Sequence, residues 1–228
     1  MLLNINGLTA ETRAAFDLFL FAARGRYLTM TTSHTAVTPD AVAALHAQCT
    51  AMAEATLSSI ERSLDAYVAL VGVLSNQNTI DGIEARRGRL LGQLYRVLTT
   101  CVTSIGRDLK RSSRRLDVHG AMGLLAQQRA ASPVFEVADA AGRMWRAEVL
   151  VPTMVRDFAY QAYLDAQLCE LTDKGDLATV IYSDSAHANH GLVFSISGLT
   201  PGYPTLADIR ASIFHPNTSA KVVSYVSP

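Results

Sequence analysis

Residues 38–116 carry the feature that most limits how this chain can fold, two long runs of apolar residues at helical spacing. In the first run the apolar positions recur at steps of three and four, close to the period of one helix face. They are Val42, Leu45, Cys49, Ala53, Leu57, Ile60, Leu64, Tyr67, Val71 and Leu74. Thr38 suits a helix cap, Pro39 the first helical position, and Asp40 the positive end of the dipole. The run predicts an unbroken helix of roughly 35 residues, about 50 Å long.

A second helical run follows a polar turn at residues 75–78 and starts near Thr79, another expected cap. Its apolar stripe is Ile80, Ile83, Leu90, Leu94, Leu98, Cys101, Ile105 and Leu109, and Arg87 interrupts it. Gly88 and Gly92 share a helix face, where they either admit a close partner backbone or lie exposed. The first run carries most of the acids and the second most of the arginines. Antiparallel pairing would place opposite charges beside the seam.

The residues before this hairpin predict a short lead and a third helix. Residues 1–8 are apolar and suit an edge strand or an arm. A helix is expected over residues 9–30, with a buried face formed by Phe16, Phe19, Leu20, Ala23 and Tyr27. Leu18 and Phe21 widen that face, so we expect the helix to be covered on more than one side.

Beyond the hairpin the pattern changes from helical to alternating. Gly120 and Gly123 are expected to interrupt the helix before a short helical piece at residues 124–131, and Ser132-Pro133 marks a predicted domain boundary. Strands are expected at 134–137, 144–151, 177–182, 192–197 and 221–226, with helices after Pro152 and after Thr205. The order is β-β-α-β-β-α-β. The sequence therefore predicts an α+β protein, with a helical bundle over residues 1–131 and a small mixed domain over residues 132–228.

Composition limits the class of function. The 228 residues carry 20 basic and 20 acidic side chains, so the net charge of zero argues against a general nucleic-acid binder and favours self-association. Cys49, Cys101 and Cys169 lie far apart, which predicts buried thiols and a reducing compartment rather than a disulfide framework. Residues 1–15 lack the pattern of a secretory signal, and the apolar stretch 16–23 is too short to span a membrane.

Residues 184–190 are the strongest enzymatic candidate. Asp184, His187 and His190 are chemically suited to bind Zn²⁺, but they lie in a loop between strands and have no neighbouring glutamate as general base. Nucleophile-elbow, Walker and dinucleotide-binding motifs are absent from the sequence. We therefore expect a protein that is not an enzyme and that needs no cofactor, with these three residues as the alternative metal site.

The most basic segment lies at the end of the second run. It contains Arg107, Lys110, Arg111, Arg114 and Arg115. Cations suit the negative end of a helix dipole, and the same cluster could contact phosphates or an acidic partner. No aromatic residue interleaves the basic ones, which argues against stacking on single strands.

Two long stripes offer more apolar surface than one intramolecular pair is expected to bury, so copies in a ring would bury the remainder. This layout resembles the head-to-tail connector or adaptor proteins of tailed bacteriophages, ring-forming subunits with a helical bundle, a β-containing extension and arm-like ends. The resemblance covers the layout of the whole chain and rests on no residue motif. It implies a homo-oligomer in the virion, assembled in the host cytoplasm, between a portal ring and a tail component. It also implies that the basic segment lies near packaged DNA.

Two other functions fit the same residues. One is a metal-dependent enzyme centred on the 184–190 loop. The other is a cytoplasmic regulatory module that dimerises through the hairpin and contacts nucleic acid through the basic segment.

Overall fold

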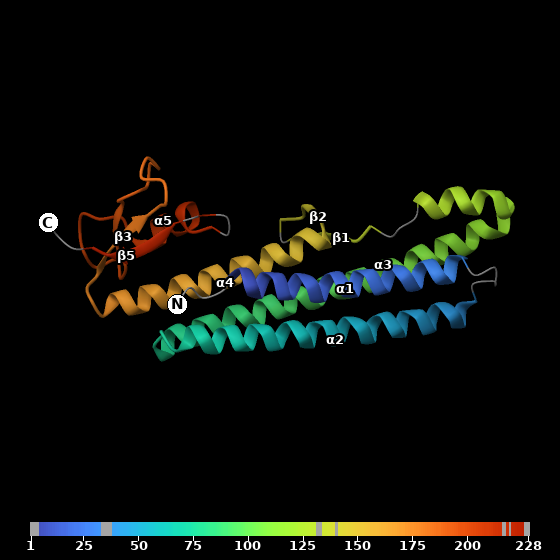
Figure 1. Cartoon of the computed structure of the whole chain (residues 1–228), viewed down its shortest axis with the longest axis horizontal. Coiled ribbons are helices and arrows are strands. Elements are labelled where there is room, and N and C mark those ends of the chain that lie inside the picture. The colour runs from blue at the N-terminus through green and yellow to red at the C-terminus, as the bar shows by residue number, and fades with distance from the viewer. Residues whose placement is uncertain are drawn as a thin grey trace. The chain divides into compact units, whose positions relative to one another are not determined.

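The structure is a computed structural model that describes residues 5–32, 38–130, 134–139, 141–215, 218 and 220–225, with only the backbone for 31–32 and 110–130. The helices are α1 (Ile5–Thr32), α2 (Pro39–Gly72), α3 (Gln77–Ala130), α4 (Ala147–Thr172) and α5 (Leu206–Ile213). The strands are β1 (Glu136–Ala138), β2 (Met144–Arg146), β3 (Leu177–Ile181), β4 (Val193–Ser195) and β5 (Lys221–Ser224) (Figure 1). The α+β class and the order β-β-α-β-β-α-β after the long helices are confirmed.

The chain forms two compact units, each assembled from separate stretches. The first, here called the sheet unit, comprises the described residues of Met1–Leu8, Leu64–Gly88 and Thr153–Pro228. The second, the helix unit, comprises those of Thr9–Ser63 and Arg89–Pro152. Helices α2, α3 and α4 therefore each contribute to both units. Ser132 and Pro133, the predicted domain boundary, lie outside the described residues.

The hairpin of α2 and α3 follows the predicted antiparallel pairing. Within the sheet unit, Gly72 faces Ile80 and Asp65 pairs with Arg87; within the helix unit, His46 faces Gly106. As the residue number falls along α2, the number of the facing residue on α3 rises by the same amount, as antiparallel helices require. Thr38 caps α2 as expected, because its Oγ1 accepts the amide of Ala41 at 3.2 Å. Asn76 rather than Thr79 caps α3, since Asn76 Oδ1 accepts the Thr79 amide at 2.9 Å.

The helix unit buries the inner face of α1 together with the hairpin stripes. Phe16, Phe19, Leu20, Ala23 and Tyr27 of α1 are all at most 3 % exposed, as predicted. The stripes contribute the buried residues Leu45, Cys49, Ala53, Ile60, Leu90, Leu94, Leu98, Cys101, Ile105 and Leu109. Burying one such leucine or phenylalanine contributes about 1.5–3 kcal/mol. The stripes are therefore largely used within the chain, and the expected surplus along them is not observed.

The sheet unit packs helices α4 and α5 against an antiparallel sheet of order β4-β3-β5. Its core contains Leu164, Leu168, Ala178, Val180, Phe194, Ile209, Ile213, Phe214 and Val222. Thr205 and Asp208 form a capping box at the start of α5, in which each side chain accepts the backbone amide of the other residue. Tyr67 of α2 donates its hydroxyl to the Ala159 carbonyl of α4 at 2.8 Å and fixes these helices within the unit.

Four further sequence expectations were wrong. Residues 5–8 are the first turn of α1 rather than a strand or arm. Helix α3 continues through Gly120 and Gly123 to Ala130, since isolated glycines cost only about 1 kcal/mol each in a long helix. Leu18 and Phe21 are not covered by the described chain; they are 69 % and 79 % exposed. They lie off the buried face of α1, so a second covering surface would be needed to enclose them.

The fourth error concerns the predicted strand 144–151. Only Met144–Arg146 forms a strand, and α4 begins at Ala147 and contains Pro152. A proline inside a helix removes one backbone hydrogen bond, here the one to the carbonyl four residues earlier, at a cost of roughly 3 kcal/mol. Ala147, Leu150, Val151 and Val155 are buried on both sides of it, and this packing outweighs the local preference against helix.

Candidate interaction surface

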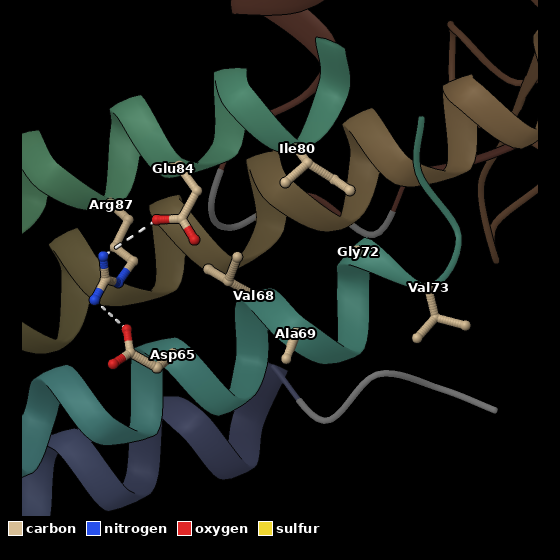
Figure 2. A pocket seen from close by; sticks show the side chains of 8 residues that line it. All are labelled: Asp65, Val68, Ala69, Gly72, Val73, Ile80, Glu84 and Arg87. Carbon is tan, nitrogen blue, oxygen red and sulfur yellow. Dashed lines mark hydrogen bonds and ion pairs between the residues drawn. The ribbon is translucent and has the colours of Figure 1, made fainter. Parts of the chain in front are cut away.

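A shallow pocket lies where α2 and α3 approach their connecting turn, entirely within the sheet unit (Figure 2). Its volume is about 610 Å³, and it is lined by Asp65, Val68, Ala69, Gly72, Val73, Ile80, Glu84 and Arg87. Val73 lies in the turn, and the spacing of the other lining residues follows the helical repeat, so they come from one face of each helix. We call this pocket the hairpin groove. Its place between two antiparallel helices is where a third helix packs in a bundle.

One end of the hairpin groove is charged. The Arg87 guanidinium contacts the Asp65 carboxylate across the helix pair and the Glu84 carboxylate at 3.1 Å (Figure 2). The Asp65 and Glu84 side chains are 51 % and 48 % exposed, so each ion pair contributes only about 0–1 kcal/mol. The three groups orient the helices more than they stabilise them. They also leave two half-exposed carboxylates at this end.

The other end of the groove is apolar and exposed. Val73 is 81 % exposed, and the neighbouring Leu70 and Leu74 are 37 % and 41 % exposed. These three residues fall within the last turns of α2 and the start of the turn that follows it. Apolar side chains that cluster in this way on a monomer often mark a contact surface. The stripe of α2 thus ends in an exposed residue, Leu74, although most of its other residues are buried.

A second polar cluster links three helices inside the sheet unit. The Asp165 carboxylate of α4 contacts the guanidinium groups of Arg86 on α3 and Arg210 on α5, the latter at 2.6 Å. Gln161, one turn earlier, accepts from Arg210 at 2.9 Å and donates to the Phe214 carbonyl at 2.7 Å. The Asp165 side chain is only 14 % exposed. Because its donors come from two other helices, this cluster fixes α3 and α5 against α4, and its polar groups are used in doing so.

The loop that carries the metal candidates uses those side chains in local contacts. Asp184 Oδ1 accepts the Ala186 amide at 2.9 Å, and His187 Nδ1 accepts the Asn189 amide at 3.1 Å while its ring stacks on Tyr182 at 3.7 Å. His190 Nδ1 lies 3.1 Å from the Tyr182 carbonyl oxygen. Among the described residues, which include this whole loop, no group of three His, Cys, Asp or Glu side chains is placed to hold a metal ion.

The neighbouring carboxylate of Asp176 is also committed to the fold. Its oxygens accept from the hydroxyls of Ser195 and Thr200, each at 2.5 Å, and from the Ser197 amide at 2.7 Å. These hydrogen bonds stabilise the ionised form and hold the pKa of Asp176 far below its usual range. These hydrogen bonds hold the segment between β4 and α5 against Asp176. The Asp176 carboxylate therefore has a structural role and stays ionised near neutral pH.

The basic segment belongs to α3, which runs unbroken from Gln77 to Ala130. Arg107 is exposed, and one of its guanidinium nitrogens lies 3.3 Å from the Ser104 hydroxyl. The side chains of Lys110, Arg111, Arg114 and Arg115 lie outside the described residues. The helical backbone places these positions on less than two turns of one helix, as the sequence indicates.

Two of the three thiols are buried. Burial raises the pKa of Cys49, and it raises the pKa of Cys101 to about 12. Cys169 is partly buried, and its sulfur accepts the Asn76 amide at 3.2 Å. A thiol must ionise to act as a nucleophile, so neither buried cysteine suits that role.

The comparisons with known proteins add nothing to these observations: no protein-family model, curated protein or solved structure matched the chain. A search of the described helices for an apolar segment long enough to cross a lipid bilayer also found none. Neither the hairpin groove nor the Asp165 cluster is evident from the sequence, because both depend on which residues of separate helices meet. Leu18 and Phe21 are evident as apolar residues of α1, but the sequence predicts a covered face for them.

Proposed function

We propose that this protein is a self-associating structural subunit. The observation that supports this proposal is that large apolar side chains are exposed on a well-formed helix, α1, and in the turn that follows another, α2. Leu18 and Phe21 of α1 are 69 % and 79 % exposed, and Val73 beside the hairpin groove is 81 % exposed. Single exposed apolar residues are common in monomers, but paired ones on a rigid face favour a contact with another protein.

A closed ring is the specific form of this proposal. Head-to-tail rings require two different surfaces on each subunit, and the chain offers apolar surfaces in both compact units. The role of a connector between a phage portal and tail is consistent with the layout of long helices followed by a small β-containing domain. In that role the Arg107–Arg115 segment would lie near DNA, and other virion proteins would bind to the exposed faces.

The mass of the native particle tests the proposal. Light scattering coupled to gel filtration, over a hundredfold range of protein concentration, should give a multiple of the 24.6 kDa chain mass that rises or saturates with concentration. A mass of one chain throughout that range would contradict self-association.

The two alternatives have separate tests. Zinc bound in a one-to-one ratio and lost on changing His187 and His190 together would favour the enzyme. DNA binding that weakens steeply with salt, and further when Arg111, Arg114 and Arg115 are replaced, would favour the regulatory module.

A further inference from the structure

The outward side of α1 has the spacing of a coiled-coil seam. Ala14, Leu18, Phe21 and Gly25 follow one another at steps of four, three and four residues, the repeat with which two helices pack together. All four are exposed, and a Cβ atom added to Gly25 would meet nothing within 4 Å in the described part of the chain. We call these four residues the outer face of α1. The two large residues lie in the middle of this face, and one small residue lies at each end.

We propose that the outer face of α1 pairs with the same face of a second copy, with the two helices antiparallel. In this arrangement Leu18 of each copy packs beside Phe21 of the other, and Ala14 of each lies opposite Gly25 of the other. The two large residues form the centre of the contact, and the small ones let the two helices approach closely at both ends of the face. The inference rests on the proposed function, because it names one contact of the self-association proposed above.

Charge favours the antiparallel direction. Asp17 and Arg24 lie on the same flank of the outer face, and antiparallel pairing brings Asp17 of each copy near Arg24 of the other. The side chains are 50 % and 32 % exposed, so both are accessible. Arg24 is held in place from within its own chain, because it lies 3.5 Å from Glu148 and stands over the Phe135 ring at 5.2 Å. The other flank carries the small residues Ala15 and Ala22 and no charge.

A parallel pair would lack this pairing of charges. Phe21 would then meet Phe21 and Gly25 would meet Gly25, so large layers would again lie between small ones and side-chain size does not set the direction. Neither Asp17 nor Arg24 would face an opposite charge across the seam. The charges beside the outer face are therefore complementary to each other only when one helix is reversed.

The size of the face sets the expected strength. Twelve residues of helix span about 18 Å, which is less surface than the roughly 800 Å² per partner of a standard stable interface. We therefore expect this contact to be reversible and concentration-dependent when isolated. Within a larger assembly it would add to contacts made elsewhere on the subunit.

Disulfide trapping tests both the face and the direction. Under mild oxidation, a mixture of Ala14→Cys and Gly25→Cys chains should give a mixed cross-linked dimer, because antiparallel pairing places these positions opposite each other. Gly25→Cys alone should not cross-link, since its two copies would lie about 16 Å apart along the seam. The unmodified chain, with its own three cysteines, is the control.

The possible results of cross-linking and scattering test the register, the pairing of α1 and the proposed function separately. A dominant cross-link between two Gly25→Cys chains would overturn the antiparallel register. If scattering shows an oligomer and no mixed cross-link forms, the self-pairing of α1 is wrong while the proposed function stands. A protein that stays monomeric in scattering contradicts the proposed function itself.

A substitution supplies an independent readout. Phe21→Ser should raise the dissociation constant of self-association roughly tenfold or more, because Phe21 is the largest side chain of the face. Leu199→Ser is the matched control, since Leu199 is 84 % exposed in a loop of the sheet unit. Circular dichroism should show unchanged helix content for both. Equal effects of the two substitutions, or none from Phe21→Ser, would overturn the proposal.

Discussion

The two faces of α1 have similar apolar side chains but opposite environments. Phe16 on the inner face is 1 % exposed, whereas Phe21, little more than one helical turn later, is 79 % exposed. Both are phenylalanines on the same helix of the helix unit, so composition and helix propensity do not separate them. What separates them is whether the chain itself provides a covering surface. The inner face is used in folding, and the outer face remains available for association.

The largest expected effect tests this comparison directly. Phe16→Ala should lower the free energy of unfolding by about 3–5 kcal/mol, because it leaves a cavity in a packed core. Phe21→Ala should change it by less than about 0.5 kcal/mol. Urea denaturation at low protein concentration, where self-association is minimal, measures both. Equal losses would mean that Phe21 is covered in the folded monomer.

The same contrast applies to charged groups of the sheet unit. Asp165→Asn should lower the free energy of unfolding by about 2 kcal/mol, because it leaves Arg86 and Arg210 without their shared carboxylate in a partly buried site. Glu170→Gln on the same helix is the control. Its ion pair with Lys174 is more than half exposed on both sides, so its removal should cost under about 0.5 kcal/mol.

A smaller effect depends on pH. Partial burial opposes ionisation of Asp139, but hydrogen bonds from Arg143, Trp145 and Ala141 outweigh it and lower the pKa to about 2, from an ordinary value of 3.8. A depressed folded-state pKa stabilises the fold above pH 4, and this stabilisation is lost as the pH falls towards 2. The stability difference between the natural chain and Asp139→Asn should therefore be largest near neutral pH and shrink in acid. A difference that grows in acid would contradict this assignment.

The smallest effect is expected at the hairpin groove. Glu84→Gln should lower the free energy of unfolding by at most about 1 kcal/mol, and less in high salt, because Glu84 is half exposed. Urea denaturation at low and high salt measures it. A loss that is larger and independent of salt would show that the charged end of the groove is a buried structural site.

The sequence predicted the elements whose signals are periodic or local. The stripes of α2 and α3, the inner face of α1 and the Thr205–Asp208 capping box follow from spacing and side-chain chemistry alone. The start of α4 did not, because the alternation from Met144 favours a strand and Pro152 disfavours a helix, and only the burial of Ala147 and Val151 reverses that preference. The exposure of Phe21 depends on which face of α1 the rest of the chain leaves uncovered. The periodicity of apolar residues does not encode that choice.

The candidate site residues show the same contrast between what the sequence reveals and what only the fold reveals. Asp184, His187 and His190 were recognisable as ligand types, but their use in loop hydrogen bonds is a property of the folded loop. Arg86 and Asp165 are separated by 79 positions, so nothing in the sequence signals their contact. The basic run at Arg107–Arg115 was recognisable from sequence, and its role stays a prediction.

The buried thiols of α2 and α3 have a practical consequence. Cys49 and Cys101 are 0 % and 1 % exposed, and burial disfavours the thiolate form of both. A maleimide reagent can reach their sulfur atoms only when the surrounding helices open. The rate at which these two thiols are labelled therefore measures how often the helices open, and no cysteine has to be introduced. Slower labelling at higher protein concentration would show that assembly makes this opening rarer.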